Sequence, residues 1–270
     1  MTLLIYISGV FLSLFILVLL GMKWEIKIKV TLPSAFFIGI LSGAIVHGFY
    51  LFWQLRYYQI LLIEIVLVGV IAVSMLLWRF FRDPERIPPG SENVILSPAD
   101  GRIIYIKKIE ENEIPFSEKK GRKFSLDEFI QSNIDINNGY LIGIAMNYLD
   151  VHVNRAPIAG RITLLKHIKG LFISLKNKEA VLQNERVLTV IDNGHFQVGI
   201  VQIASRLVRK IVPYITEGRQ IQIGERMGMI RFGSQVDLII PALPSLRLDI
   251  KINEEVKACM SIIASFNRRI

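Results

Sequence analysis

The stretch TLLIYISGVFLSLFILVLLGM at residues 2–22 decides the character of the fold, because no charged side chain interrupts it. Two further apolar runs follow, at residues 30–55 (VTLPSAFFIGILSGAIVHGFYLFWQL) and residues 60–78 (ILLIEIVLVGVIAVSMLLW). Each run is close to the roughly 20 residues that an α-helix needs to cross the hydrocarbon core of a bilayer. Residues 1–82 are therefore predicted to be a membrane region with about three transmembrane helices.

Two other interpretations of these runs are weaker. The first run lacks the basic start and the small-residue cleavage site of a signal peptide, so we expect it to be retained. The second and third runs could form a buried helical hairpin of a soluble protein, but too little polar surface is present to cover it. Glu64 lies near the start of the third run, where it is expected to snorkel or to face a neighbouring helix.

The basic residues of the short loops predict the orientation of the helices. The loop between the first two runs and the segment after the third run are basic, whereas only Arg56 lies between the second and third runs. The positive-inside rule therefore places the N-terminus outside and the chain after about Arg79 in the cytoplasm of a multi-pass protein of the cell membrane. The residues that carry this bias are Lys23, Lys27, Lys29, Arg79 and Arg82.

The composition excludes several classes of protein. Of the 270 residues, 52% are hydrophobic and only 20% are charged, which excludes a disordered chain. Cys259 is the only cysteine, so an intrachain disulfide and a cysteine-based zinc site are both excluded. With four histidines, no metal site is expected. The formal net charge of +9 indicates an anionic partner, such as a membrane surface, an acidic substrate or nucleic acid.

Residues 83–270 have a different pattern, in which short β-branched stretches alternate with Gly, Pro, Asn and Asp. This pattern is typical of strands joined by turns and predicts a mainly-β (α+β) domain. DPERIPPGSENV at residues 83–94 is expected to be the linker into this domain. SLDEFIQSNI at residues 125–134 is the one short helix predicted within it, and VKACMSIIA at residues 256–264 is predicted to form a C-terminal strand pair.

Four short motifs remain after the common catalytic signatures are found to be missing. They are SPADG (97–101), LDVHVNRAPIAG (149–160), NERV (184–187) and RFGS (231–234). Taken singly, Asp100 reads as a turn residue, His152 as a core histidine, and Gly233–Ser234 as a hairpin turn between two strands. NERV reads as an exposed loop followed by a strand.

Taken together and in this order, these motifs resemble those of the phosphatidylserine decarboxylase family. The resemblance runs from about Phe81 to the C-terminus and includes FRDPER (81–86) and the VKACMSIIA stretch. It is closest to the short form of the family, in which LDVHVNRAP replaces the DYHxxHxP segment of longer members. The three apolar runs lie outside this common core.

The resemblance implies a proenzyme that cuts itself between Gly233 and Ser234. Residues 1–233 would form a large chain and residues 234–270 a small chain, which remain partners. Ser234 would become a covalent pyruvoyl group and the only cofactor, with no metal. Its carbonyl would form a Schiff base with the amine of the serine phospholipid and withdraw electrons as carbon dioxide leaves.

The resemblance also implies roles for four other residues. His152 would orient the substrate carboxylate or supply a proton, and Asp150 belongs to the same segment as a candidate substrate-binding residue. Asp100 would orient a base during self-cleavage. Arg155 stands where longer members have a second histidine, so their three-residue relay is not carried over, because arginine does not act as a base. Arg155 is expected either to bind the lipid phosphate or carboxylate or to form a surface ion pair.

The implied activity is the decarboxylation of phosphatidylserine to phosphatidylethanolamine in phospholipid biosynthesis, with an anionic phospholipid and the membrane as partners. One alternative is decarboxylation of another serine phospholipid, archaetidylserine. A second is a non-catalytic, membrane-anchored β-domain that binds lipid or a partner. Nucleic-acid binding is not expected, because the basic residues are scattered, and homo-oligomer formation stays open.

Overall fold

The computed structural model describes residues 1–24, 26–90, 93–115, 123–125, 129–131, 134, 136–171, 183–204, 210–231 and 234–266. The chain forms two compact units. One contains Met1–Phe81 and Asn147–Leu149, and the other contains Arg82–Met146 and Asp150–Ile270.

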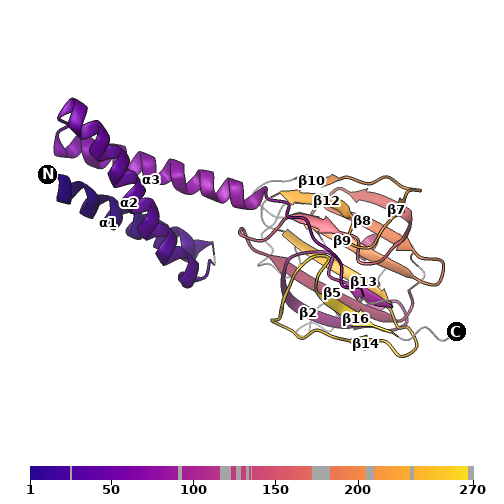
Figure 1. The fold of residues 1–270 in the computed structure, drawn as a ribbon. Helices are drawn as coiled ribbons and strands as arrows, with labels where there is room; N and C mark the ends of the chain where they lie inside the picture. The colour runs from indigo at the N-terminus through magenta and orange to yellow at the C-terminus, as the bar shows by residue number, and fades with distance from the viewer. Residues whose placement is uncertain are drawn as a thin grey trace. The chain divides into compact units, whose positions relative to one another are not determined.

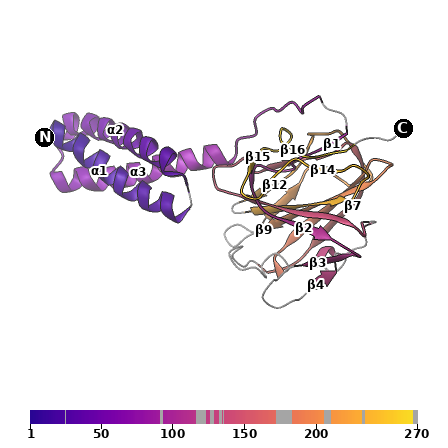
Figure 2. The same cartoon turned by 90° about the horizontal axis from the view of Figure 1, so that it is seen from below.

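The first unit is helical. Its helices are α1 (Thr2–Lys23), α2 (Ile28–Trp53) and α3 (Tyr57–Phe80), which lie side by side in Figures 1 and 2. All three are long and apolar enough to cross a membrane, so the prediction of three spans from the apolar runs is confirmed at this level.

Helices α1 and α2 pack with their backbones almost in contact. A Cβ atom added to Gly39 would lie 2.5 Å from Val10 Cα, and one added to Gly9 would lie 2.8 Å from the Gly39 carbonyl oxygen. Small residues at this crossing let the two helices approach closely, which is how helices associate where no hydrophobic effect drives them together. The Ser13 hydroxyl adds a hydrogen bond of 2.6 Å to the Ala35 carbonyl oxygen of α2.

The Glu64 side chain is buried within this helical unit. The hydroxyl of Ser8 on α1 donates a hydrogen bond of 3.1 Å to Glu64 Oε1 on α3. Glu64 therefore faces a neighbouring helix and does not snorkel to the membrane edge. Its hydrogen bond joins α1 to α3 in a setting where polar contacts between helices are stabilising.

The second unit is built from short strands. In chain order they are β1 (Val94–Leu96), β2 (Gly101–Ile109), β3 (Glu113–Pro115), β4 (Lys123–Ser125), β5 (Gly139–Met146), β6 (Val153–Arg155), β7 (Gly160–Ile168), β8 (Arg186–Asp192), β9 (Gln197–Ala204), β10 (Lys210–Pro213), β11 (Gln220–Ile221), β12 (Arg226–Arg231), β13 (Ser234–Pro241), β14 (Arg247–Leu248), β15 (Glu255–Val256) and β16 (Ile262–Ser265). The mainly-β prediction is confirmed.

An eight-stranded antiparallel sheet organises this unit, with the order β11-β7-β8-β9-β13-β5-β2-β15. Two three-stranded sheets, β10-β12-β6 and β1-β16-β14, and the β3–β4 hairpin complete it. Strand β13 lies inside the large sheet between β9 and β5 (Figure 1). Val236, Leu238 and Ile240 belong to one apolar cluster and Ile239 to another, so both faces of β13 are covered. This explains why its apolar run is nearly continuous.

Two sequence predictions need comment. The segments within VKACMSIIA and just before it do form strands, but β15 pairs with β2 whereas β16 pairs with β1 and β14. The prediction that they pair with each other is therefore wrong, because the two strands belong to different sheets. Half of the helix predicted at residues 125–134, namely residues 126–128 and 132–133, lies outside the described residues.

We predict that Gly39→Leu destabilises the helical unit. The added side chain has no room against the α1 backbone, and overpacking of this kind costs about 1–3 kcal/mol of unfolding free energy. The thermal midpoint of helix loss, followed by circular dichroism in detergent, should therefore fall.

Gly69→Leu provides the matched control, because nothing lies within 4 Å of a Cβ atom added at Gly69. Its thermal midpoint should stay at the wild-type value. Equal midpoints for the two variants would contradict the close α1–α2 crossing.

Candidate active site

The residue predicted to be modified, Ser234, begins the central strand β13. Its backbone lies opposite Met146 of β5 on one side and Ala204 of β9 on the other. The preceding strand β12 pairs with β10 and β6, in a different sheet. The interpretation of Gly233–Ser234 as a hairpin turn is therefore wrong, because the chain changes sheets between Arg231 and Ser234. Gly233 itself lies outside the described residues.

The NERV segment fixes the strand end beside Ser234. The buried Asn184 side chain donates a hydrogen bond of 2.9 Å from Nδ2 to the Ala204 carbonyl oxygen. The Ala204 backbone N–H in turn donates to the Glu185 carbonyl oxygen at 2.9 Å. The backbone N–H and C=O groups of Ala204 are thus both hydrogen-bonded to NERV residues. NERV therefore packs against the end of β9 and is not an exposed loop.

His152 is fully buried just before β6. Its Nδ1 lies 2.9 Å from the Asp150 carbonyl oxygen. A carbonyl only accepts hydrogen bonds, so Nδ1 carries the hydrogen and Nε2 is the basic nitrogen of the neutral ring. Burial lowers the pKa of His152 to about 4, although the hydrogen bond to Asp150 and the charge of Asp100 act in the opposite direction. The imidazole is therefore neutral at pH 7.

Asp100 is the most densely bonded of the predicted site residues. Arg86 donates to both of its carboxylate oxygens, at 2.5 and 2.8 Å, and the backbone N–H of Ala258 donates to Oδ1 at 2.9 Å. The N–H of Val151, the residue before His152, lies 3.4 Å from Oδ2. Asp100 and the His152 segment are therefore brought together, and the turn-residue interpretation of Asp100 misses these contacts.

The glycine of SPADG is required by its surroundings. Gly101 has φ +149°, and a Cβ atom there would collide with the Ala145 carbonyl oxygen of β5. Glycine tolerates both conditions because it has no side chain. The turn can therefore bring Asp100 close to the sheet.

Arg155 is buried and bound to the segment that follows α3. Its guanidinium donates to Asp83 Oδ1 at 3.1 Å, to the Pro84 carbonyl oxygen at 3.0 Å and to the Gly224 carbonyl oxygen at 3.1 Å. The ion pair with Asp83 joins a buried guanidinium to a partly exposed carboxylate, so it is not a pair between two surface side chains. A lipid ligand would have to compete with these bonds, so a substrate-binding role for Arg155 stays a prediction.

Two buried amides lie near the backbone of Ser234. Gln202 Nε2 donates a hydrogen bond of 2.7 Å to Asn154 Oδ1, and Asn154 Nδ2 lies 4.0 Å from the sulfur of Met146. Gln202 is opposite Val236 in the sheet, and Met146 is opposite Ser234. The side-chain amides of Asn154 and Gln202 thus place polar groups near the start of β13, within an otherwise apolar core.

A second polar cluster lies farther along the same strand. The Tyr105 hydroxyl donates to Asp237 Oδ2 at 2.6 Å, and Gln235 Nε2 donates to Asp237 Oδ1 at 2.7 Å. Tyr105 on β2 reaches β13 because Gly143 of the intervening strand β5 leaves room for its ring. Burial raises the pKa of Asp237 to about 6.

Sequence reasoning missed Arg86 and the Asn154–Gln202 pair. FRDPER is part of the family pattern, but nothing in its six letters indicates that the last arginine binds Asp100. Asn154 lies inside the LDVHVNRAPIAG motif, so it could have been proposed; Gln202 carries no such signal. Among the described residues no cluster of three or more His, Cys, Asp or Glu side chains is arranged to hold a metal.

The sequence matches known proteins over most of its length. The sequence model of a family described as Phosphatidylserine decarboxylase matches residues 73–264. A protein of Methanocaldococcus jannaschii is 43% identical over 73% of this chain and 93% of its own length, and one of Methanothermobacter thermautotrophicus is 38% identical over 76% and 86%. Both bear the provisional name archaetidylserine decarboxylase proenzyme. The phosphatidylserine decarboxylase proenzyme of Azorhizobium caulinodans is 39% identical over 64% of this chain and 68% of its own length.

We predict that Arg86→Gln destabilises the β-rich unit. The variant leaves the buried Asp100 carboxylate without its ion pair, and breaking such a pair costs about 3–5 kcal/mol of unfolding free energy. Arg247→Gln is the control, because its ion pair with Asp249 is on the surface and is worth at most about 1 kcal/mol. Thermal loss of the β-sheet signal measures the stability of both variants. Similar midpoints for the two would argue against a stabilising ion pair between Arg86 and Asp100.

We predict a pH dependence of stability that originates at His152. Since its pKa falls from 6.5 to about 4 on folding, the unfolded chain binds the proton more readily between these values. The stability that neutral His152 contributes is fully present above pH 6.5 and is lost as the pH falls towards 4. The midpoint difference between the wild type and His152→Gln should change over this window.

His195→Gln replaces an exposed histidine with the same side chain and provides the control for the substitution itself, so its thermal midpoint at pH 7 should stay close to that of the wild type. A difference between the wild type and His152→Gln that stays constant from pH 7 to pH 4 would refute the buried, neutral imidazole.

Proposed function

Because the chain belongs to the phosphatidylserine decarboxylase family, we propose that it is a membrane-anchored proenzyme that cuts itself at Gly233–Ser234 and then decarboxylates phosphatidylserine. The observation that carries this proposal is the position of Ser234. It starts a strand in the middle of the large sheet, at the point where the chain leaves another sheet. A binding module has no need for a Gly–Ser junction at such a crossing.

Self-cleavage uses the chemistry of Ser234 and its neighbours. The Ser234 hydroxyl oxygen attacks the Gly233 carbonyl carbon, the C–N bond breaks, and an ester replaces the amide. Elimination then releases the chain ending at Gly233, and water replaces the nitrogen of residue 234, which leaves as ammonia. The fixed partners Met146 and Ala204 hold the strand that follows, so the junction stays in place while its bonds change.

The surroundings of Ser234 fit a pyruvoyl group. The buried amides of Asn154 and Gln202 supply hydrogen-bonding groups near the start of β13, and the site needs no metal for this chemistry. When present, the pyruvoyl group supplies an electrophilic carbonyl that accepts the electrons left behind as carbon dioxide departs.

Three acidic or basic residues complete the proposed machinery. Nε2 of the neutral His152 can accept the hydroxyl proton of Ser234 or donate a hydrogen bond to the substrate carboxylate once protonated. Asp150 orients that ring through its backbone carbonyl oxygen, and its side chain is a candidate for substrate binding. Asp100, held by Arg86, binds the N–H of Val151 and so fixes the loop that carries His152.

We further propose that the three helices lie in the cell membrane with the catalytic unit on the cytoplasmic side. The basic residues flanking α1 and α3 support this orientation. Archaetidylserine, which the names of the two archaeal relatives contain, presents the same serine headgroup, so the same residues would serve that substrate.

Self-cleavage is tested by the intact mass of the denatured protein. The wild type should separate into a chain ending at Gly233 and a small chain beginning with a carbonyl-bearing residue 234, whereas Ser234→Ala should stay whole and inactive. Ser245→Ala, an exposed serine of the same small chain, should be cut like the wild type. A folded wild type that stays whole would leave the non-catalytic, membrane-anchored β-domain as the better explanation.

A further inference from the structure

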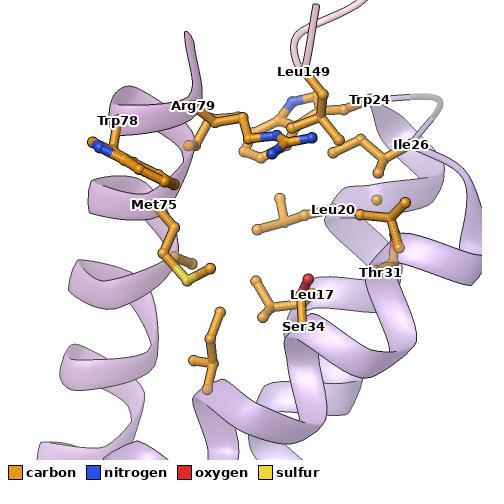
Figure 3. A pocket seen from close by; sticks show the side chains of 15 residues that line it. Leu17, Leu20, Trp24, Ile26, Thr31, Ser34, Met75, Trp78, Arg79 and Leu149 are labelled. Atoms are coloured by element: carbon orange, nitrogen blue, oxygen red, sulfur yellow. The ribbon is translucent and has the colours of Figure 1, made fainter. Parts of the chain in front are cut away.

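The helical unit contains an apolar cavity of about 290 Å³. It lies where α1 ends, α2 begins and α3 ends, so it opens at one edge of the membrane region. Figure 3 shows side chains from all three helices around it, with Leu149 at its top. The aliphatic part of the wall includes Leu17, Leu20, Ile26, Val30, Ile38 and Leu76.

One cation lies at the mouth of this cavity. Figure 3 shows the Arg79 side chain extending from α3 across the opening, towards Trp24 and Leu149. Within the described part of the chain, no carboxylate forms an ion pair with the Arg79 guanidinium. This contrasts with Arg86, Arg155 and Arg226, each of which binds an acidic side chain.

The tryptophan and lysine side chains around the opening indicate that it lies at the depth of the lipid headgroups. Trp24 and Trp78 both line the cavity near its mouth, and tryptophan is enriched at the boundary between hydrocarbon and water. The exposed side chains of Lys23, Lys27 and Lys29 belong to the same edge, because they lie at the end of α1, in the short connection and in the first turn of α2. A phosphate bound to Arg79 would thus be surrounded by positive charge.

We propose that this cavity binds an anionic glycerophospholipid, with its phosphate on Arg79 and the upper part of one hydrocarbon chain against the apolar wall. A guanidinium suits a phosphate because it donates parallel hydrogen bonds to two oxygens. The cavity is too small for a whole lipid, so the rest of the lipid stays in the bilayer. The proposal gives the helices a binding role beyond anchoring, and it does not depend on decarboxylation.

Photo-crosslinking in nanodiscs tests this site. The probes are phosphatidylglycerol and phosphatidylcholine that carry the same diazirine-labelled acyl chain; neither has the serine headgroup that the proposed reaction consumes. With phosphatidylglycerol, we expect labelled peptides to concentrate on the cavity-lining parts of α1 and α3. Phosphatidylcholine should label them several-fold less, because its choline cation is repelled by the basic edge.

Two substitutions and one control make the test specific. Arg79→Gln removes the charge and Ala72→Phe fills the cavity from α3, so each should reduce cavity labelling by phosphatidylglycerol several-fold. Arg56→Gln changes an exposed arginine at the other end of α3 and should leave the labelling unchanged. Circular dichroism of each variant verifies that the helices are intact.

Three outcomes would overturn the proposal. They are equal labelling of the wild type and Arg79→Gln, labelling spread evenly over all lipid-facing sides of the helices, and equal labelling by the two lipids. Each can occur whether or not the protein cuts itself at Ser234, so failure of this site and failure of the proposed function are distinguishable.

Discussion

The buried ion pair between Arg86 and Asp100 is the interaction on which the site depends most. Asp100 also accepts a hydrogen bond from Ala258 and contacts the N–H of Val151. One carboxylate therefore joins the segment after α3, the SPADG turn, the His152 loop and the C-terminal stretch. Separating a buried carboxylate from several hydrogen-bond donors costs much free energy. Asp100 therefore holds these four segments of the chain together.

The central position of β13 is the second constraint. Its two neighbours hold the backbone from Ser234 onward, and its faces are covered by two apolar clusters. Polar groups enter this core in two places only within the described part of β13: around Gln202 and Asn154 near the strand start, and around Asp237 farther along. The strand is thus held rigidly where a bond beside it is proposed to break, which supports precise placement of the reacting atoms.

The helical unit is stabilised by a different kind of packing. Its helices associate through close backbone contact at Gly9 and Gly39 and through the Ser8–Glu64 hydrogen bond, as expected where lipid replaces water. The packing leaves a cavity near Arg79 that is apolar inside and cationic at its mouth. A membrane anchor needs no such cavity, whereas a lipid-binding site does.

Local patterns in the sequence are enough to predict the three spans, the mainly-β class and the family. Those features depend on local quantities, namely the length of apolar runs, the spacing of turn residues and the order of short motifs. It also pointed to Ser234, His152 and Asp100, although their roles stay predictions. It did not reveal that Arg86 binds Asp100, that Gln202 binds Asn154 or that Tyr105 binds Asp237, because these contacts form only when separate strands and turns come together in the fold.

The pairing of the short strands, in contrast, is evident only from the three-dimensional fold. The sequence around Gly233–Ser234 is equally compatible with a hairpin and with a change of sheet, because a Gly–Ser pair suits both, and the long-range partners Met146 and Ala204 select the second. For the same reason β15 and β16 separate into different sheets instead of pairing with each other. Strand pairing depends on which distant backbone has unpaired hydrogen-bonding groups, and local sequence does not encode that information.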